Sequence, residues 1–235
     1  MRNTYLDLVA SFGIGGAHPG GFSLTKSILK DENIQPNDTV LDIGCGTGQT
    51  AAFLAQRFQC QVTAVDNHPT MIRKARERFE SNDLSITVLE GDAQNIKLMD
   101  NSFDLIIAES VISFTTISKT LNELSRVLKS GGRLILIEMA AEQSLSEEVR
   151  NKVSSLYGIH EILNEHEWKS KLQQAGFTQI EIIETPSGLI QTDIHDSNQS
   201  ENINADLYDL WDEHDRFITQ NHDVIGFRAF RCQLI

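Results

Sequence analysis

The sequence predicts an α/β fold: a doubly wound, mainly parallel sheet with helices on both faces and an antiparallel closing strand. Three observations support this prediction. Apolar strand-like runs alternate with helical runs from residue 39 to residue 138. These runs are apolar almost throughout, as is typical of parallel strands that are covered on both faces. The chain then ends in a helix and two further strand-like runs, which we interpret as a closing hairpin.

The first 33 residues are expected to form a separate helical segment. Apolar residues recur at helical spacing over residues 5–12, directly after Thr4, which is a favourable N-cap. The glycine-rich stretch GIGGAHPGGF follows, and a second helix is expected from about residue 23 to residue 30.

Residues 34–140 contain the alternating core. Each expected helix lies between two expected strands, but the link between the third and fourth strands shows no obvious helix. The expected strands are residues 39–43, 61–65, 85–90, 103–108 and 132–138, and the expected helices are near residues 49–59, 70–81 and 117–128. The motif KSGG follows the last of these helices, where a glycine with positive φ is expected to end it.

Residues 141–235 are expected to complete the same domain. The stretch HEWKSKLQQAG predicts a helix that stops at Gly176, and the next run predicts a strand that ends near Thr185. The run DVIGFRAFRCQLI predicts the last strand. Between them, residues 193–223 carry nine Asp or Glu and a single Arg, with apolar residues on one helical face. We interpret this stretch as an acidic amphipathic helix, within an insertion of about residues 186–222 that covers the core.

Composition and charge restrict the class of protein. With 235 residues and 40% hydrophobic composition, the chain is long enough for one domain with a full core. The formal net charge of −13 argues against a nucleic acid or an anionic membrane as a partner. No apolar run approaches the length that spans a bilayer. The cysteines, Cys45, Cys60 and Cys232, fit no metal or redox spacing, so we expect no metal site and a cytoplasmic location.

A glycine-rich loop follows the first expected strand, in the motif VLDIGCGTGQT. Gly44 and Gly46 fit the dinucleotide fingerprint G-x-G-x-x-G. The third glycine of that fingerprint is absent, because Gln49 stands there and the additional glycine is Gly48. Asp42 precedes the first glycine by two residues, and its carboxylate would repel a pyrophosphate. The same carboxylate suits the ammonium and sulfonium groups of S-adenosylmethionine.

These motifs resemble the Rossmann-fold S-adenosylmethionine-dependent methyltransferases over roughly residues 34–140. The motif VLDIGCGTG is similar to that family's cofactor loop, which implies that Asp42 and the three glycines surround the amino-acid end of the cofactor. The motif VTAVDNH is similar to the family's second strand. This similarity implies that Asp66 accepts both ribose hydroxyls and that Asn67 lies against the adenine edge.

Two further motifs extend the resemblance. LEGDAQNI implies that Asp92 and the backbone of Ala93 face the adenine amino group, and FDLIIAESVISF implies that Glu109 lies beside the cofactor and the acceptor pocket. For Glu109 we favour a partner of the cofactor ammonium over a base. Taken alone, Asp66 would also suit a helix cap and Asp92 a solvated loop acid. Their order at successive strand ends favours a cofactor site.

The resemblance also implies that the N-terminal segment, residues 1–33, folds over the cofactor as a lid. Within it, Gly20 and Gly21 would let the backbone approach the cofactor closely. His18 is the candidate catalytic residue, as a base or as a group that orients the acceptor. The alternative is that His18 and Pro19 only rigidify a turn. Three histidines of the acidic insertion, His195, His214 and His222, are expected at the surface.

The resemblance implies methyl transfer to a small-molecule acceptor by in-line displacement, which depends on positioning and has no fixed catalytic signature. Aromatic residues near the expected covers would make the acceptor pocket partly apolar. One alternative is a non-catalytic, regulatory S-adenosylmethionine-binding protein, which would keep the cofactor residues without an open acceptor pocket. An NAD-dependent oxidoreductase is disfavoured by Gln49 and Asp42. The sequence predicts neither the acceptor nor the oligomeric state.

Overall fold

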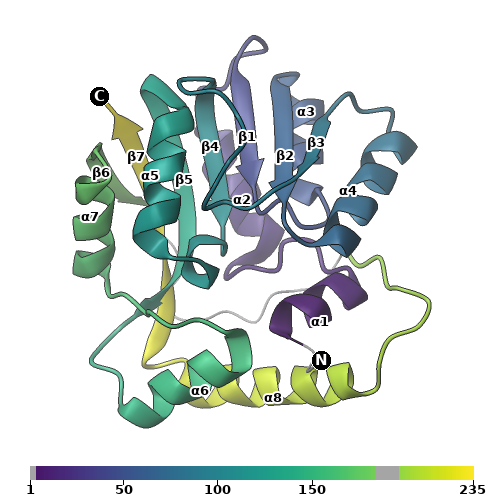
Figure 1. The fold of residues 1–235 in the computed structure, drawn as a ribbon, viewed down its shortest axis with the longest axis vertical. Helices are drawn as coiled ribbons and strands as arrows, with labels where there is room; N and C mark the ends of the chain where they lie inside the picture. Colours follow the sequence, from purple (N-terminus) through teal and green to yellow (C-terminus); the bar gives the residue numbers. More distant parts are fainter. Residues whose placement is uncertain (1–3, 184–195) are drawn as a thin grey trace.

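A computed structural model describes residues 4–183 and 196–235, and it confirms the predicted fold class. The described residues form one seven-stranded sheet in the order β3-β2-β1-β4-β5-β7-β6 (Figure 1). All neighbouring strands are parallel except β7, which runs antiparallel to both β5 and β6. The strands are β1 (Thr39–Ile43), β2 (Gln61–Asp66), β3 (Thr87–Glu90), β4 (Phe103–Glu109), β5 (Leu128–Ala141), β6 (Phe177–Ile183) and β7 (Ile225–Leu234).

Helices cover both faces of the sheet. They are α1 (Tyr5–Phe12), α2 (Gly21–Lys30), α3 (Gln49–Phe58), α4 (Pro69–Ser81), α5 (Ile117–Val127), α6 (Glu147–Tyr157), α7 (Glu165–Gln174) and α8 (Asp206–Asn221). Successive residues of β1 alternate between two buried clusters, with Leu41 and Ile43 in one and Val40 in the other. The first cluster includes residues of α5 and α7, whereas the second includes residues of α2, α3 and α4.

Helices α1, α6 and α8 form a further layer, which we call the cover, at the end of the molecule toward which the parallel strands run (Figure 1). Two apolar clusters hold these helices together, one between α6 and α8 and the other between α1 and α8. Tyr5 of α1 packs against both clusters. The cover is therefore a small apolar layer of its own, separate from the clusters that flank the sheet.

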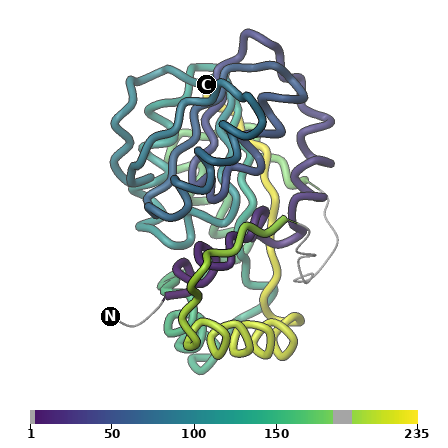
Figure 2. The backbone as a smooth tube through the Cα atoms, turned by 90° about the vertical axis from the view of Figure 1, so that its right-hand side faces the viewer, coloured from purple at the N-terminus to yellow at the C-terminus, as the bar shows by residue number. Residues whose placement is uncertain are grey.

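The stretch before α8 joins the cover to the N-terminal segment. Residues 196–200, which we call the strap, run beside residues 11–15, as Figure 2 shows. Asn198 N donates to Gly13 O at 3.0 Å, and Gly15 N donates to Asp196 O at 3.0 Å. Lys74 Nζ of α4 donates both to Asn198 O in the strap and to Ser11 O in the N-terminal segment. The strap is thus hydrogen-bonded to the N-terminal segment and to α4.

The structure differs from the sequence prediction at several boundaries. The acidic helix is shorter than expected, because α8 begins at Asp206 and the strap before it is not helical. Helix α5 ends at Val127, and β5 starts directly afterwards, so Gly131 has its positive φ within the strand and not at the helix end. The end of β6 near Thr185, the start of the insertion and His195 lie outside the described residues. The division of the chain at residues 33 and 140 stays a prediction.

Helix α6 was missing from the sequence prediction, although its end signals are ordinary ones. Ser146 caps it by accepting from Val149 N at 3.2 Å, and Gly158 ends it with a φ of +77°. In the described part of the chain, no helix is both long and apolar enough to cross a bilayer. The same residues contain no cluster of three or more His, Cys, Asp or Glu that could hold a metal ion.

Candidate functional site

A cavity of about 510 Å³ lies between the carboxyl ends of the parallel strands and the cover. Its lining comes from the loops after β1, β2, β3 and β4, from α1 and residues 16–19, and from one face of α8. Open parallel sheets bind ligands at this edge. We call the part beside the loops after β1, β2 and β3 the cofactor lobe. The acceptor lobe is the part lined by Tyr5, Phe114, Tyr157, Trp211 and His214.

Asp42 and Gly46 mark the centre of the cofactor lobe. Asp42 ends a buried strand and is itself 3% exposed, yet its Oδ2 atom has no hydrogen-bond partner among the described residues. Burial raises the pKa of Asp42 well above its ordinary range, and the nearby Glu109 carboxylate raises it further. Gly46 has a φ of +53°, and a Cβ there would point into open space. The lobe therefore offers an unsatisfied carboxyl group next to backbone that a ligand can approach.

The other glycines of the loop serve packing. A Cβ on Gly44 would lie 2.1 Å from a methyl group of Val111, and a Cβ on Gly48 would lie 2.5 Å from the Phe79 ring of α4. Gly44 lines the cavity, but Gly48 is absent from its described lining. Gly48 thus allows close packing of the loop on α4. Its contact with the cofactor stays a prediction.

Asp66 ends β2 and fixes the loop after β1. Its Oδ2 accepts from Gly46 N at 2.9 Å and its Oδ1 accepts from His68 N at 2.8 Å. Burial raises the pKa of Asp66, while these backbone N–H groups oppose the rise. Helix α4 has its own N-cap in His68, whose ring accepts from Thr70 N at 3.2 Å. Asp66 is therefore not the helix cap, and its carboxylate and the exposed Asn67 both line the cavity.

Asp92 and Ala93 follow β3 at the same edge. Ala93 is buried and Asp92 is exposed, and both line the cofactor lobe. One oxygen of Asp92 accepts from Gln94 N at 2.8 Å, so part of its carboxylate is used within its own loop. As expected, no helix joins β3 to β4 in this described stretch.

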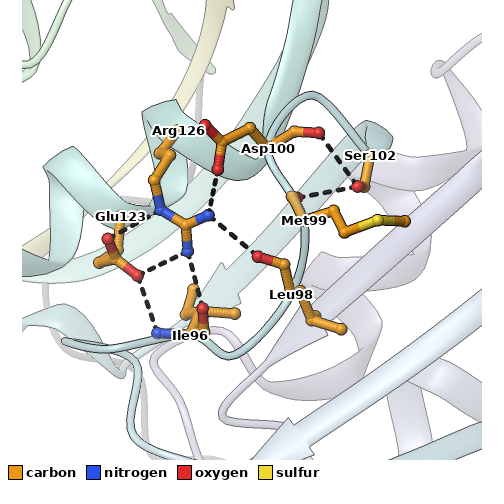
Figure 3. Close-up of polar contacts among 7 residues, drawn as sticks. All are labelled: Ile96, Leu98, Met99, Asp100, Ser102, Glu123 and Arg126. Carbon is orange, nitrogen blue, oxygen red and sulfur yellow. Dashed lines mark hydrogen bonds and ion pairs between the residues drawn. The ribbon is translucent and has the colours of Figure 1, made fainter.

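Arg126 of α5 holds that loop in place (Figure 3). Its guanidinium donates to Ile96 O at 2.7 Å and to Leu98 O at 2.9 Å. Glu123, one turn earlier on α5, binds the same guanidinium at 2.8 Å and accepts from Ile96 N at 2.8 Å (Figure 3). The link between β3 and β4, which contains no helix, is thus held by an ion pair on α5.

Glu109 at the end of β4 has both carboxylate oxygens engaged. Thr25 of α2 donates to Oε1 at 2.5 Å, and Thr50 of α3 donates to Oε2 at 2.8 Å. His18 lies against the same group, with Nε2 3.0 Å from Thr25 Oγ1 and 3.5 Å from Glu109 Oε1. Its Nδ1 donates to Pro19 O at 3.1 Å. The structure brings His18 and Glu109 together at the cavity wall, with both ring nitrogens of His18 in contact with protein atoms.

Gly20 and Gly21 do not line the cavity in the described structure. Gly20 is the N-cap of α2 with a φ of +80°, and Gly21 follows with +54°. A Cβ on Gly20 would collide with the side chain of Leu24. These two glycines shape the entry into α2, whereas the preceding residues 16–19 line the cavity. The expectation that Gly20 and Gly21 contact the cofactor stays a prediction.

The acceptor lobe is built from aromatic rings. The Tyr5 ring lies 4.8 Å from the Tyr157 ring edge-on, and 5.1 Å from the His214 ring. Tyr157 Oη and His214 Nδ1 are 2.8 Å apart. Burial raises the pKa of Tyr5 to about 12 and lowers the pKa of His214. Both groups are therefore neutral near pH 7. The sequence placed His214 at the surface, which is wrong, because it faces the cavity; the exposed His222 also reaches its lining.

Glu138, Thr25 and Thr50 were not predicted as site residues from the sequence. Glu138 is fully buried in β5, which lies inside the sheet. It accepts from Val111 N and Ile112 N at 2.8 and 2.6 Å, and from Ser113 Oγ at 2.6 Å. It holds the turn after β4 beside the cavity. A carboxylate that ends the apolar run LILIE is the signal by which Glu138 could have been found. Thr25 carries no such local signal, because its partner Glu109 is 84 residues away.

Comparisons with known proteins agree with this geometry. A family model described as a methyltransferase domain matches residues 34–180. The Bacillus subtilis uncharacterized methyltransferase YodH is 33% identical over 96% of this chain and 97% of its own length. Phosphoethanolamine N-methyltransferase 1 of Arabidopsis thaliana is 28% identical over 72% of this chain and 34% of its own length.

A solved structure shows the same fold. Phosphoethanolamine N-methyltransferase 2 of Haemonchus contortus, in complex with S-adenosyl-L-methionine, superposes with a TM-score of 0.76 and 22% identity. The match covers 97% of this chain and 56% of that one. The family model and the Bacillus subtilis relative span the strands whose ends carry Asp42, Asp66 and Glu109. This chain belongs to the class I S-adenosylmethionine-dependent methyltransferases.

Proposed function

We propose that this methyltransferase acts on a small-molecule acceptor, which binds in the acceptor lobe beneath the cover. One observation carries the proposal: a single cavity joins the strand-end carboxylates to a second lobe of aromatic rings. A regulatory protein that only bound the cofactor would not need this second lobe. The names of the plant and nematode relatives refer to phosphoethanolamine, and they support the small size of the acceptor but not its charge.

The residues of the cofactor lobe fit S-adenosylmethionine. The unpartnered Oδ2 of Asp42 suits a bound ammonium group, and the open space at Gly46 suits a ligand close to the backbone. Asp66 keeps lone pairs free for two ribose hydroxyls, because each of its oxygens accepts only one backbone bond in the structure. We assign the adenine end to Asn67, Asp92 and Ala93. When bound, the cofactor supplies an electrophilic methyl group on a sulfonium.

Around the acceptor, the protein's own contribution is positioning and exclusion of water. The cover closes the cavity opposite the strand ends, and preorganised placement can account for roughly 7–11 kcal/mol of barrier lowering. We propose that His18 positions Glu109 through Thr25, since both of its ring nitrogens already contact protein atoms. Direct action of His18 as a base is the alternative. The chain's charge of −13 supports an acceptor other than a nucleic acid. Three free, buried cysteines support a reducing, cytoplasmic setting.

The proposal is tested by transfer of a labelled methyl group from S-adenosylmethionine to the components of a metabolite extract. Calorimetry with S-adenosylmethionine, S-adenosylhomocysteine and NAD first establishes the cofactor. We expect Asp66→Asn to weaken cofactor binding about tenfold or more, because a charge-assisted hydrogen bond is worth ~1.5–3 kcal/mol. Asp83→Asn, an exposed substitution at the end of α4, is the matched control. Cofactor binding without transfer to any component would favour the regulatory alternative, and preferential NAD binding would contradict the proposal.

A further inference from the structure

We propose that the acceptor is a neutral or cationic molecule with an apolar body, held among the aromatic rings of the acceptor lobe and beside the Asp215 carboxylate. This inference rests on the proposed function and adds the chemical class of the acceptor. It excludes acceptors that carry a phosphate or carboxylate group into the lobe.

The first support is the charge of the cavity. Among the described residues that line it, none is a Lys or an Arg. Six carboxyl groups line it instead: Asp42, Asp66, Asp92, Glu109, Glu138 and Asp215. A phosphate or carboxylate group that left water for this site would find no Lys or Arg to replace its hydration, and transfer without such compensation is costly.

Basic residues close to the cavity are already used elsewhere. Lys74 of α4 donates to the backbone oxygens of Ser11 and Asn198 in the lid and strap. Arg78 of the same helix binds Asp196 at 2.6 Å and Thr47 O at 2.7 Å.

The same holds in the cover. There, Lys152 of α6 pairs with Glu213 of α8. His214 does not supply a cation either, because burial lowers its pKa and keeps it neutral near pH 7. An anion in the acceptor lobe would therefore have to break existing contacts to gain a charged partner.

The second support is the arrangement of rings around Asp215. Trp211 Nε1 donates to Asp215 Oδ2 at 3.0 Å, one turn away on α8, and both residues line the cavity. Asp215 acts on the opposite wall as well, because its charge adds to burial in raising the pKa of Tyr5 and Tyr157. Phe114 stacks parallel to Tyr5 at 6.4 Å.

Rings and a carboxylate in one lobe favour a cation or a neutral apolar group. The faces of aromatic rings attract cations, with ~0.5–2 kcal/mol for each well-placed contact. Helix α8 adds a long-range negative potential that attracts cations, since it carries five Asp or Glu and one Arg. Rings and field together disfavour an anion at the entrance and inside the lobe.

The inference is tested with three ligands that share a phenyl ring and differ in charge: 2-phenylethylamine, 2-phenylethanol and 3-phenylpropionate. Dissociation constants are measured at pH 7 on protein saturated with S-adenosylhomocysteine, by calorimetry and ligand-observed NMR. Trp211 fluorescence locates the binding, because the second tryptophan, Trp168, is fully buried in the core. We expect the amine and the alcohol to bind at least about tenfold more tightly than the carboxylate.

Variants connect the preference to the lobe. Asp215→Asn is expected to reduce the advantage of the amine over the alcohol severalfold. Asp209→Asn makes the same change of charge on an exposed position of α8 outside the cavity lining and is expected to leave that advantage unchanged. Equal effects of the two variants would overturn the role of Asp215.

Two other outcomes would overturn the inference as a whole. One is a carboxylate ligand that binds as tightly as the amine, and the other is a loaded protein that binds none of the three ligands. Failure of S-adenosylhomocysteine itself to bind would instead contradict the proposed function. The two failures are therefore distinguishable within one set of measurements.

Discussion

At Asp42, we expect the stability of the protein and the proposed contact with the cofactor to oppose each other. Its carboxyl group is buried, one of its oxygens has no partner, and its pKa is raised well above the ordinary value of 3.8. A carboxyl group whose pKa rises on folding contributes stability below its unfolded pKa and loses that contribution as pH rises through the folded value. The protein without cofactor is therefore expected to lose stability from this residue as pH increases above about 3.8.

Asp42→Asn should remove that pH-dependent loss. Near neutral pH we expect the variant without cofactor to be more stable by roughly 1–3 kcal/mol, because a buried, unpaired charge is removed. Its affinity for S-adenosylmethionine should fall, because the counter-charge for the ammonium is gone. Urea unfolding between pH 4 and about pH 8, with calorimetry at the upper end, measures both effects. A variant that is equally stable and binds equally well would show that Asp42 is uncharged and unused.

His18→Ala separates positioning from catalysis. If His18 holds Glu109 through Thr25, the substitution should lower cofactor affinity and turnover together and modestly. If His18 is a base, turnover should fall by about 10²-fold or more while cofactor affinity is retained. Calorimetry and initial rates on one identified acceptor decide between these outcomes, and we expect the first.

At the scale of elements, the loop between β3 and β4 depends on Arg126. Arg126→Met removes the bonds to Ile96 O and Leu98 O and leaves Glu123 without its cationic partner. We expect cofactor affinity to fall by about threefold to tenfold, since the loop carries Asp92 and Ala93. Arg73→Met on α4 is the control, because its pair with Glu77 is exposed and such pairs are worth ~0–1 kcal/mol. An equal loss of affinity in both variants would show that this loop does not contribute to cofactor binding.

The strap depends on Gly13. A Cβ on this residue would lie 2.0 Å from Asn198 O, so Gly13→Ala must displace the strap. Gly158→Ala is the matched control, because Gly158 has a φ of +77° like the +62° of Gly13 but open space around its Cβ. Both substitutions place an alanine in the left-handed backbone conformation, which costs ~1–2 kcal/mol. Only Gly13→Ala should also speed limited proteolysis of the strap and weaken cofactor binding. Equal proteolysis of the two variants would contradict this role of the strap.

These elements also show what a sequence can predict about such a site. Asp42 and Asp66 were found because each is a carboxylate at the end of an apolar strand and next to a local motif. Gly20 and Gly21 do not line the cavity, which the sequence could not show because paired glycines suit a tight entry into a helix as well as close approach to a ligand. The contact between Thr25 and Glu109 and the placement of His214 depend on long-range packing, which leaves no periodic signal in the chain.

At the scale of the whole molecule, we expect the cover to open as one unit. Its helices share two apolar clusters, and the hydrogen-bonded strap ties it to the N-terminal segment. The sheet between its flanking helices has larger clusters of fully buried residues. Regions with fewer buried contacts open at lower free energy than the global unfolding. We therefore expect the cover to open while the sheet stays folded, which gives ligands access to the cavity.

Hydrogen exchange with and without S-adenosylhomocysteine tests this expectation. A ligand at about 100 times its dissociation constant stabilises the binding-competent state by ~2.7 kcal/mol, so amides that exchange by opening of the cover should slow by about a hundredfold. Amides of α1 and α8 should slow by the same factor, because the two helices share one cluster. Amides of β1 and β4 that exchange only by global unfolding should remain more strongly protected against exchange than the amides of the cover. Slowing confined to the loops after β1 and β2, with α1 and α8 unchanged, would show that the cover does not close over the ligand.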